Sequence, residues 1–328
     1  MFELWSQFPN IAAQLKEVHT LMQERLTMKS GPLQAILDEL LATRGKLLRP
    51  GLFLLFSNLN TSSSLKANNE SEIKIAASLE LLYMATLVHD EIIDDSPLRR
   101  GKQTVQSKYG KDIAVYTGDL LFTVMFDLVV EAFNGTPYVQ RNVKVMRELL
   151  IGELDQMTHR YNLNVTVDDY LFNAQHKTAA LFQLACEEGA YLAGLNETQI
   201  YDASQVGRYM GIAFQIYDDI LDYTSSEEVL NKPVLEDLSQ GVYTLPLLLA
   251  RQEHKSLFDP YLLKKDQLTE QEAQEVNRYV LKYEGVKKAQ QVAEHYTQKA
   301  LDHLHQLPDT PTRQGIESII LLLLERKQ

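Results

Sequence analysis

Apolar residues recur at spacings of three and four along almost the whole chain, which is the period of an amphipathic helix. Alternating apolar and polar runs of the kind that form strands are scarce. Short segments rich in glycine, proline, serine and asparagine separate the periodic stretches. The pattern predicts helices near residues 11–28, 32–42, 46–58, 71–95, 111–134, 138–161, 167–193, 197–223, 242–253, 269–283, 286–305 and 312–327.

These helices predict an all-α fold. No connecting segment is long enough, or low enough in complexity, to separate two domains. We therefore expect a single domain over residues 1–328, with a central bundle and smaller helices at 260–328. Thr269 and Glu272 have the spacing of a capping box, which predicts one helix start. The helices within residues 1–30 are expected to pack in a dimer interface.

Two apolar helical stretches each end in clustered acids. These acids are Asp90, Glu91, Asp94 and Asp95 in the first cluster and Asp218, Asp219 and Asp222 in the second. Acids four residues apart on a helix lie on one face, where like charges repel. The runs before them are apolar all round, as in buried helices. One copy alone fits an acidic helix end on the surface equally well. Two copies predict cation sites that face each other across a cavity.

Composition and charge exclude several classes of protein. The chain has 44 acidic and 32 basic residues and a net charge of -12, which disfavours nucleic-acid binding because that needs a basic surface. The single Cys186 excludes an intramolecular disulfide and a cysteine zinc cluster. No signal sequence or membrane-spanning run is apparent, so we expect a cytoplasmic protein that an apolar product brings to a membrane surface.

Basic residues near the acidic clusters suit an anion. Gly45 permits close backbone approach, and Lys46 and Arg49 are three apart and so share a face of the predicted helix. Arg99 and Arg100 directly follow the first acidic cluster, and a divalent cation beside arginines is a usual clamp for a diphosphate. Taken alone, each basic pattern fits a solvated surface equally well.

Three further polar residues have the same two interpretations. Lys177 lies in a predicted apolar helix, where a lysine often extends its charged end to the surface. Lys232 follows the second acidic cluster in a predicted loop. Gln215 lies three residues before Asp218, on the same helix face.

The ligand types favour magnesium. Carboxylate oxygens are hard ligands, which suit Mg²⁺ better than a transition metal. A carboxylate-bridged di-iron bundle needs Glu-x-x-His pairs, and none of the eight histidines follows a glutamate by three residues. A phosphate-binding glycine loop and a nucleophile–base–acid triad are also not apparent in the sequence.

The chain resembles the all-trans polyprenyl diphosphate synthases, the family of farnesyl and geranylgeranyl diphosphate synthases, and above all their hexaprenyl and heptaprenyl catalytic subunits. The matching motifs, in family order, are Gly45-Lys46 with Arg49-Pro50, the first acidic cluster with Arg99-Arg100-Gly101, Gly118-Asp119, Lys177-Thr178, Gln215 with Asp218-Asp219 and Asp222, and Lys232 with Asp237. The resemblance implies a helical bundle of the isoprenoid synthase type around a deep central cavity, usually in a dimer.

The resemblance also implies an activity. It implies an Mg²⁺-dependent prenyltransferase that condenses an allylic diphosphate with isopentenyl diphosphate through an allylic carbocation. The implied metal ligands are Asp90, Asp94, Asp218 and Asp222, with Glu91 and Asp219 in support. The implied contacts to the allylic diphosphate are Arg99, Lys177 with Thr178, Gln215 and Lys232. The implied isopentenyl diphosphate site comprises Gly45, Lys46, Arg49, Tyr83 and Arg100.

Three positions depart from the family pattern. Glu91 stands where the family usually has aspartate, which keeps the charge but lengthens the side chain. Tyr83 stands where many members have a histidine that contacts isopentenyl diphosphate, and Leu47 where many have a basic residue. These departures leave open a partner-dependent or regulatory subunit that binds prenyl diphosphates without extending them. A terpene cyclase is a weaker alternative, because it normally lacks the Gly45 to Arg49 motif and a second aspartate-rich motif.

Product length is predicted from side-chain size. Short-chain members often place an aromatic floor four or five residues before the first aspartate, and this chain has Thr86 and Ala85 there. We therefore expect a deep tunnel and a hexaprenyl to octaprenyl product, with heptaprenyl favoured. Candidates for a lower floor are Leu82, Phe122 and Phe126. The expected assembly is a homodimer, or a heteromer with a small partner subunit.

Overall fold

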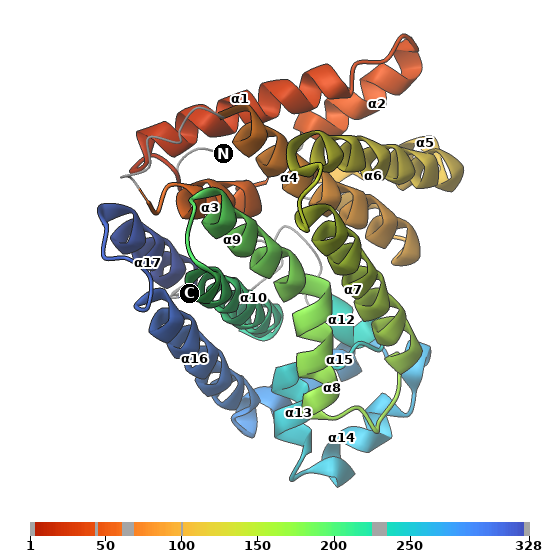
Figure 1. Cartoon of the computed structure of the whole chain (residues 1–328). Coiled ribbons are helices and arrows are strands. Elements are labelled where there is room, and N and C mark those ends of the chain that lie inside the picture. Colours follow the sequence, from red (N-terminus) through yellow and green to blue (C-terminus); the bar gives the residue numbers. More distant parts are fainter. Residues whose placement is uncertain (1–3, 43–44, 61–68, 100, 225–234, 325–328) are drawn as a thin grey trace. The chain divides into compact units, whose positions relative to one another are not determined.

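The computed structural model of the chain describes residues 4–42, 45–60, 69–99, 101–224 and 235–324. These residues are helical nearly throughout, which confirms the all-α prediction (Figure 1). Within the described ranges the only strands are β1 (Leu98–Arg99) and β2 (Lys102–Gln103), which pair antiparallel. The internal contacts divide the chain into two compact units, which are described separately below.

Unit 1 comprises Met1–Lys144, Leu184–Ser204 and Leu307–Ile316. Its elements are α1 (Pro9–Arg25), α2 (Gly31–Ala42), α3 (Leu48–Ser57), α4 (Asn69–Ile93), the β1–β2 hairpin, α5 (Val105–Tyr109) and α6 (Lys111–Phe133). Residues of α7 (Tyr138–His159), α9 (Ala180–Leu192), α10 (Glu197–Thr224) and α17 (Pro311–Leu324) belong partly to this unit and partly to unit 2.

Helix α4 packs along α6 in the core of unit 1. Leu81 and Leu82 of α4 and Leu121 and Met125 of α6 are at most 1% exposed, as the apolar run before the first acidic cluster predicts. In the described part of the chain, α6 is the one helix long and apolar enough to cross a membrane, and 44% of its most apolar window is buried. One face of α6 packs against α4, whereas apolar residues on the rest of its surface are exposed.

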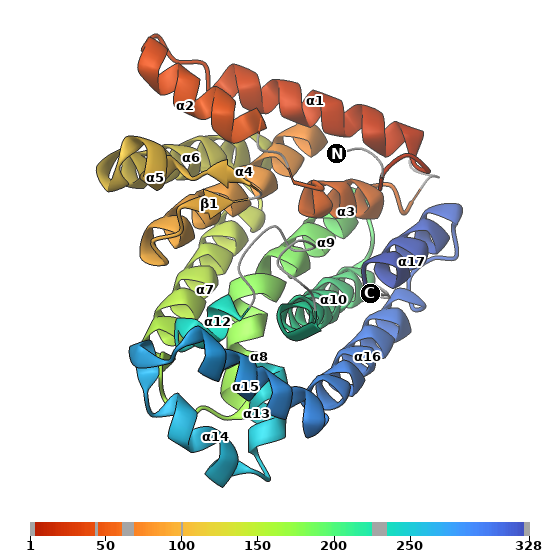
Figure 2. The same cartoon turned by 180° about the vertical axis from the view of Figure 1, so that it is seen from behind.

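Unit 2 comprises Val145–Gln183, Gln205–Gln306 and Glu317–Gln328. Its own elements are α8 (Val167–Asn173), the π-helical turn η1 (Ala174–Ala179), α12 (Glu236–Ser239), α13 (Leu245–Arg251), α14 (Lys255–Leu262), η2 (Lys265–Gln267), α15 (Glu270–Lys282) and α16 (Gly285–Leu304). Helices α13, α14 and α15 pack together (Figure 2). Both hydrogen bonds of the predicted capping box between Thr269 and Glu272 are present at the start of α15.

The structure differs from the predicted elements in several segments, and α12 and α14 are helices that the sequence analysis does not predict. The helix predicted at 167–193 is interrupted by η1, so that α8 and α9 are separate helices. The segment between α4 and α6, for which the sequence predicts no element, forms the hairpin and α5. Strands of two residues are too short to show alternation, and a π turn keeps the helical period nearly intact.

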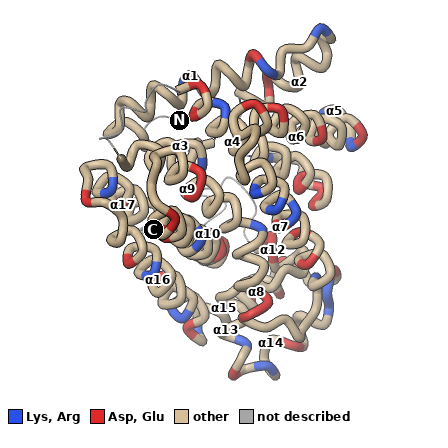
Figure 3. The backbone as a smooth tube through the Cα atoms, viewed as in Figure 1, with Lys and Arg blue, Asp and Glu red and all other residues tan. Residues whose placement is uncertain are grey.

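Lysine and arginine are interspersed with acids along the helices (Figure 3).

Candidate active site

The first acidic cluster lies at the C-terminal end of α4. The Asp94 N–H donates to the Asp90 carbonyl at 2.9 Å, so the two residues are one turn apart, and both side chains are half-buried. The last turn of a helix carries partial negative charge from its carbonyl groups. Two carboxylates in this turn add to that charge, which a bound cation would offset.

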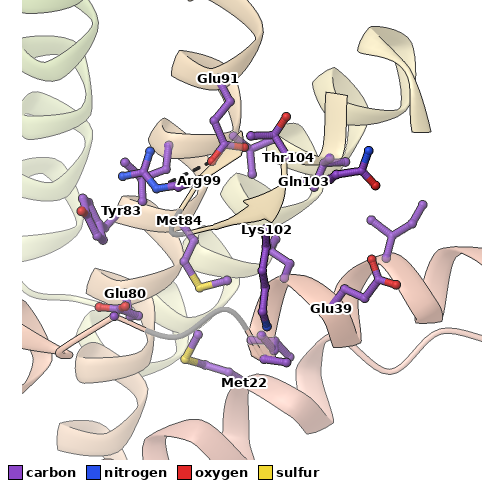
Figure 4. Close-up of a pocket in the computed structure, with 18 of the residues that line it drawn as sticks. Met22, Glu39, Glu80, Tyr83, Met84, Glu91, Arg99, Lys102, Gln103 and Thr104 are labelled. Atoms are coloured by element: carbon purple, nitrogen blue, oxygen red, sulfur yellow. Dashed lines mark ion pairs between the residues drawn. The ribbon is translucent and has the colours of Figure 1, made fainter. Parts of the chain in front are cut away.

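Glu91 faces a cavity of about 390 Å³ in unit 1, formed by α1, α2, α4, the hairpin and α5. Its carboxylate is buried, and its Oε1 lies 3.7 Å from Arg99 Nε in β1 (Figure 4). The Ser96 carbonyl accepts hydrogen bonds from Thr104 Oγ1 at 2.7 Å and Gln106 Nε2 at 2.9 Å. These bonds tie the hairpin to the end of α4 and hold Arg99 beside Glu91.

Gly118 and Asp119 of α6 hold the residue that precedes Asp90. His89 Nε2 lies 3.2 Å from Asp119 Oδ1, and its Nδ1 lies 3.0 Å from the Ala85 carbonyl. A Cβ on Gly118 would lie 2.4 Å from His89 Cε1, so only glycine admits the ring there. The Gly-Asp motif therefore fixes the last turns of α4, which carry the first acidic cluster.

Some of the predicted isopentenyl diphosphate residues border the same cavity. Gly45 and Tyr83 line it. The Arg49 guanidinium lies 3.7 Å from the centre of the Tyr83 ring, a cation–π contact that fixes a buried arginine. Tyr83 stands where many family members have a histidine. In this chain its ring contacts the Arg49 guanidinium and helps to hold it in place.

Lys46 and Arg49 do not share a helix face, and that prediction is wrong. Leu47 has a left-handed backbone with φ 50°, and α3 begins only at the next residue. The chain therefore turns between Lys46 and the helix that carries Arg49. The Lys46 side chain is exposed.

The predicted chain-length residues take two kinds of position in unit 1. Ala85 and Leu82 are at most 1% exposed. Thr86 is half-buried and donates to the Tyr83 carbonyl at 2.9 Å. Phe122 stacks on His89 with ring centres 5.4 Å apart, and Phe126, one turn further along α6, is also half-buried.

In unit 2, Lys177 and Thr178 lie in the π turn η1. Lys177 Nζ is 2.8 Å from Glu153 Oε1 and donates to Gln156 Oε1 at 2.7 Å, so its charge is paired rather than solvated. A Cβ on Gly152 of α7 would lie 2.9 Å from the Lys177 backbone nitrogen. That glycine allows α7 to approach η1 closely, and π turns occur often at functional sites.

Asp219 is the centre of a buried hydrogen-bond network in unit 2. It accepts from Tyr170 Oη at 2.5 Å and from Gln215 Nε2 at 2.8 Å. Thr178 Oγ1 donates to Gln215 Oε1 at 2.6 Å, which fixes the orientation of that amide. Burial raises the pKa of the Asp219 carboxyl well above its usual range, and the nearby charge of Asp237 raises it further. These residues line a cavity of about 140 Å³ that Lys177 also borders.

The other two acids of the second cluster differ in exposure. Asp218 is exposed, whereas Asp222 is only 3% exposed and accepts from the Leu235 backbone N–H at 3.2 Å. Arg100 and Lys232, both predicted to contact diphosphates, lie outside the described residues.

The sequence did not point to Tyr170, Gln156 or Trp5. Tyr170 is 49 residues from Asp219 in the chain, and Trp5 is 41 residues from Lys46, to whose carbonyl it donates. No local pattern reveals such pairs. A large aromatic residue with one polar atom is a weak signal, because its donor usually finds a partner when the ring is buried.

A family model and related sequences match most of this chain. A family model described as Polyprenyl synthetase matches residues 31–280. Heptaprenyl diphosphate synthase component 2 of Bacillus subtilis is 34% identical over 290 residues, which cover 88% of this chain and 81% of that protein.

Solved structures are similar over nearly the whole chain. The crystal structure of geranylgeranyl pyrophosphate synthase from Lactobacillus brevis matches with a TM-score of 0.92 and 40% identity, covering 99% of this chain and 100% of that chain. A polyprenyl synthase from Caulobacter crescentus, complexed with calcium and isoprenyl diphosphate, matches with a TM-score of 0.89 and 30% identity, covering 96% and 95%. The fold, the motifs and these similarities together show that the chain belongs to the polyprenyl synthetase family.

Proposed function

We propose that this trans-prenyltransferase uses Mg²⁺ to condense an allylic diphosphate with isopentenyl diphosphate and makes a long all-trans chain, heptaprenyl in preference. The observation that carries the long product is the pair of small residues, Ala85 and Thr86, in the last turns of α4 before Asp90. In the proposed tunnel, an aromatic ring at either position would block the path of the growing chain along α4. The relative named heptaprenyl diphosphate synthase component 2 supports the same product class.

The carboxylates suit a hard divalent cation. Both acidic clusters offer only carboxylate oxygens, which Mg²⁺ prefers. Among the described residues, no three His, Cys, Asp or Glu side chains are grouped to hold a metal by themselves. Mg²⁺ commonly takes one or two carboxylates and completes its shell with water and substrate phosphates. Asp90, Asp94, Asp218 and Asp222 fit that mode, and the Caulobacter crescentus structure contains calcium with isoprenyl diphosphate.

The mechanism follows from charge. When bound, the metal supplies positive charge that stabilises the leaving diphosphate. Arg99 and Lys177 add cationic contacts to the same group, and Gln215 adds an amide donor. Breaking the allylic C–O bond leaves a carbocation, which the isopentenyl double bond attacks before a proton is lost. No protein nucleophile is needed, and apolar walls keep water from the cation.

A product assay tests the chain-length proposal. The purified chain is given Mg²⁺, farnesyl diphosphate and labelled isopentenyl diphosphate, and product length is read by mass spectrometry. We expect heptaprenyl diphosphate from the natural chain and shorter products from Ala85→Phe and Thr86→Phe. Thr86 is half-buried and accepts a larger side chain more easily than the fully buried Ala85.

The control is Thr20→Phe on the exposed face of α1, which should leave product length unchanged. A natural chain that stops at geranylgeranyl diphosphate, the product named for the Lactobacillus brevis relative, would refute the long-chain proposal. So would an unchanged length distribution in both phenylalanine variants.

A second candidate is a catalytic subunit that needs a partner. The name of the Bacillus subtilis relative, a component 2, favours it. Ile113, Tyr116 and Val130 of α6 are 42%, 74% and 46% exposed, which is a large apolar exposure for one helix. Two measurements on the purified chain separate an enzyme that is active by itself from a subunit that needs a partner. They are the activity of the chain alone and its molecular mass in solution. A chain that binds farnesyl diphosphate without extending it would support partner dependence, and Tyr83→His is the next variant.

A further inference from the structure

Trp5, the single tryptophan of the chain, is anchored to the loop that carries Lys46. Its indole ring is fully buried in unit 1. Its Nε1 donates a hydrogen bond to the Lys46 carbonyl at 2.8 Å. A Cβ on Gly51, in the first turn of α3, would lie 2.1 Å from Trp5 Cζ2, so the ring fits against the helix only because a glycine is there. The indole therefore contacts the loop and the helix start at once.

The peptide that Trp5 holds is next to an unfavourable backbone conformation. Leu47 has φ 50° and ψ 44°, a left-handed conformation that residues with a Cβ rarely adopt. Such a conformation persists only where surrounding contacts support it. The hydrogen bond to the Lys46 carbonyl orients the peptide that joins Lys46 to Leu47. It thereby holds the turn through which the chain enters α3.

We propose that Trp5 is a positioning residue for isopentenyl diphosphate, because it fixes the backbone of Lys46 in the Gly45–Leu47 loop. The inference rests on the proposed function, in which this loop binds that substrate. The two cations of the loop region are held by different contacts. The Tyr83 ring fixes the Arg49 guanidinium, and the Trp5 indole fixes the backbone from which the Lys46 side chain extends. The N-terminal segment before α1 is thus part of the substrate site's support.

The first test is Trp5→Phe, which keeps an aromatic ring and removes the N–H donor. The Lys46 carbonyl then loses this hydrogen bond, and the loop is held less firmly in its conformation. We expect the KM for isopentenyl diphosphate to rise by about three- to tenfold, the size of one lost hydrogen bond. The KM for farnesyl diphosphate and kcat should both stay within about twofold of the values for the natural chain. The variant removes a single hydrogen bond, and that bond supports the loop proposed to bind the other substrate.

Phe8→Leu is the matched control. Phe8 belongs to the same N-terminal segment but packs near Gly315, where a Cβ would lie 2.5 Å from Phe8 Cε1. This variant should lower the unfolding temperature without changing either KM. If Trp5→Phe also lowers only the unfolding temperature and leaves the KM for isopentenyl diphosphate unchanged, Trp5 is merely structural and the inference is wrong.

A binding measurement separates this inference from the proposed activity. Because Trp5 is the only tryptophan, its fluorescence reports on this site alone. Titration with isopentenyl diphosphate in the absence of an allylic substrate should give a saturable change in emission, which Lys46→Ala weakens. A response without any product formation would support the role of Trp5 while refuting activity of the chain on its own. No response at saturating isopentenyl diphosphate would overturn the inference.

Discussion

The two acidic clusters share one spacing, yet their middle acids are stabilised in different ways. Glu91, in unit 1, lies beside the Arg99 guanidinium at 3.7 Å. Asp219, in unit 2, accepts hydrogen bonds from two neutral groups, the Tyr170 hydroxyl and the Gln215 amide. Both carboxyl groups are buried, with exposures of 8% and 4%.

The difference concerns charge compensation. An arginine neutralises a buried carboxylate, whereas neutral donors satisfy its oxygens but leave its charge in place. Burial and the neighbouring Asp237 accordingly raise the pKa of Asp219. Identical sequence spacing therefore does not imply equivalent electrostatics. We therefore expect the second cluster to depend more on an added cation than the first.

The largest expected effect comes from the outer acids. Asp90→Asn and Asp218→Asn each remove a carboxylate from the proposed metal site, and each should lower kcat by about 10²–10³, the usual cost of losing one group that stabilises developing charge. EDTA should abolish turnover of the natural chain, and Mg²⁺ should restore it. Steady-state assays with farnesyl and isopentenyl diphosphates measure both effects.

Asp95→Asn is the control for these variants. Asp95 belongs to the first cluster but is not an implied metal ligand; it is exposed, and its carboxylate lies 2.8 Å from Lys111 Nζ. Asparagine tolerates its left-handed backbone at φ 51°. The activity of Asp95→Asn should be close to that of the natural chain. Full activity in Asp218→Asn would show that the second cluster does not bind the metal.

Glycines that support each cluster give the next largest effect. A Cβ on Gly211 of α10 would lie 2.5 Å from the Ala179 backbone, whereas one on Gly118 meets the His89 side chain. Backbone yields less than a side chain, so Gly211→Ala should lower the free energy of unfolding by about 3 kcal/mol and Gly118→Ala by about 1–2 kcal/mol. Urea denaturation measures both values.

Gly31→Ala is the neutral comparison, because nothing lies within 4 Å of a Cβ at Gly31. It should change the free energy of unfolding by less than about 1 kcal/mol. Equal losses in Gly211→Ala and Gly118→Ala would show that the backbone near η1 moves as easily as the His89 ring.

The smallest effect tests the middle acids directly. Glu91→Gln removes the partner of Arg99, whose side chain is 35% exposed, and should lower the free energy of unfolding by about 1 kcal/mol. Asp219→Asn keeps hydrogen-bonding capacity toward Tyr170 and Gln215, because a tyrosine hydroxyl also accepts. It removes a buried charge and should leave stability without Mg²⁺ unchanged or slightly raised.

The double variant Glu91→Gln with Arg99→Gln completes this test. If the pair interacts, the two single losses should not add. A larger loss in Asp219→Asn than in Glu91→Gln would contradict the difference in charge compensation between the clusters.

Helices were predictable because their apolar period is a local property. The helix expected at 71–95 is α4 at Asn69–Ile93, and the one expected at 197–223 is α10 at Glu197–Thr224. The left-handed turn at Leu47 was not predictable, because its support is a tryptophan 41 residues away. The hairpin that carries Arg99 was missed for a different reason, because strands of two residues are too short to show alternation.

The sequence by itself determined the helical fold, the two acidic clusters and the family resemblance, because each depends on residue types at short spacings. Only the tertiary structure decided how each acid is compensated and what holds the Lys46 loop. Tyr170 and Trp5 reach their partners through packing between elements distant in the chain, and Arg99 reaches Glu91 through the hairpin that follows α4. Burial then sets the strength of each contact, because a low-dielectric interior strengthens hydrogen bonds and penalises unpaired charge.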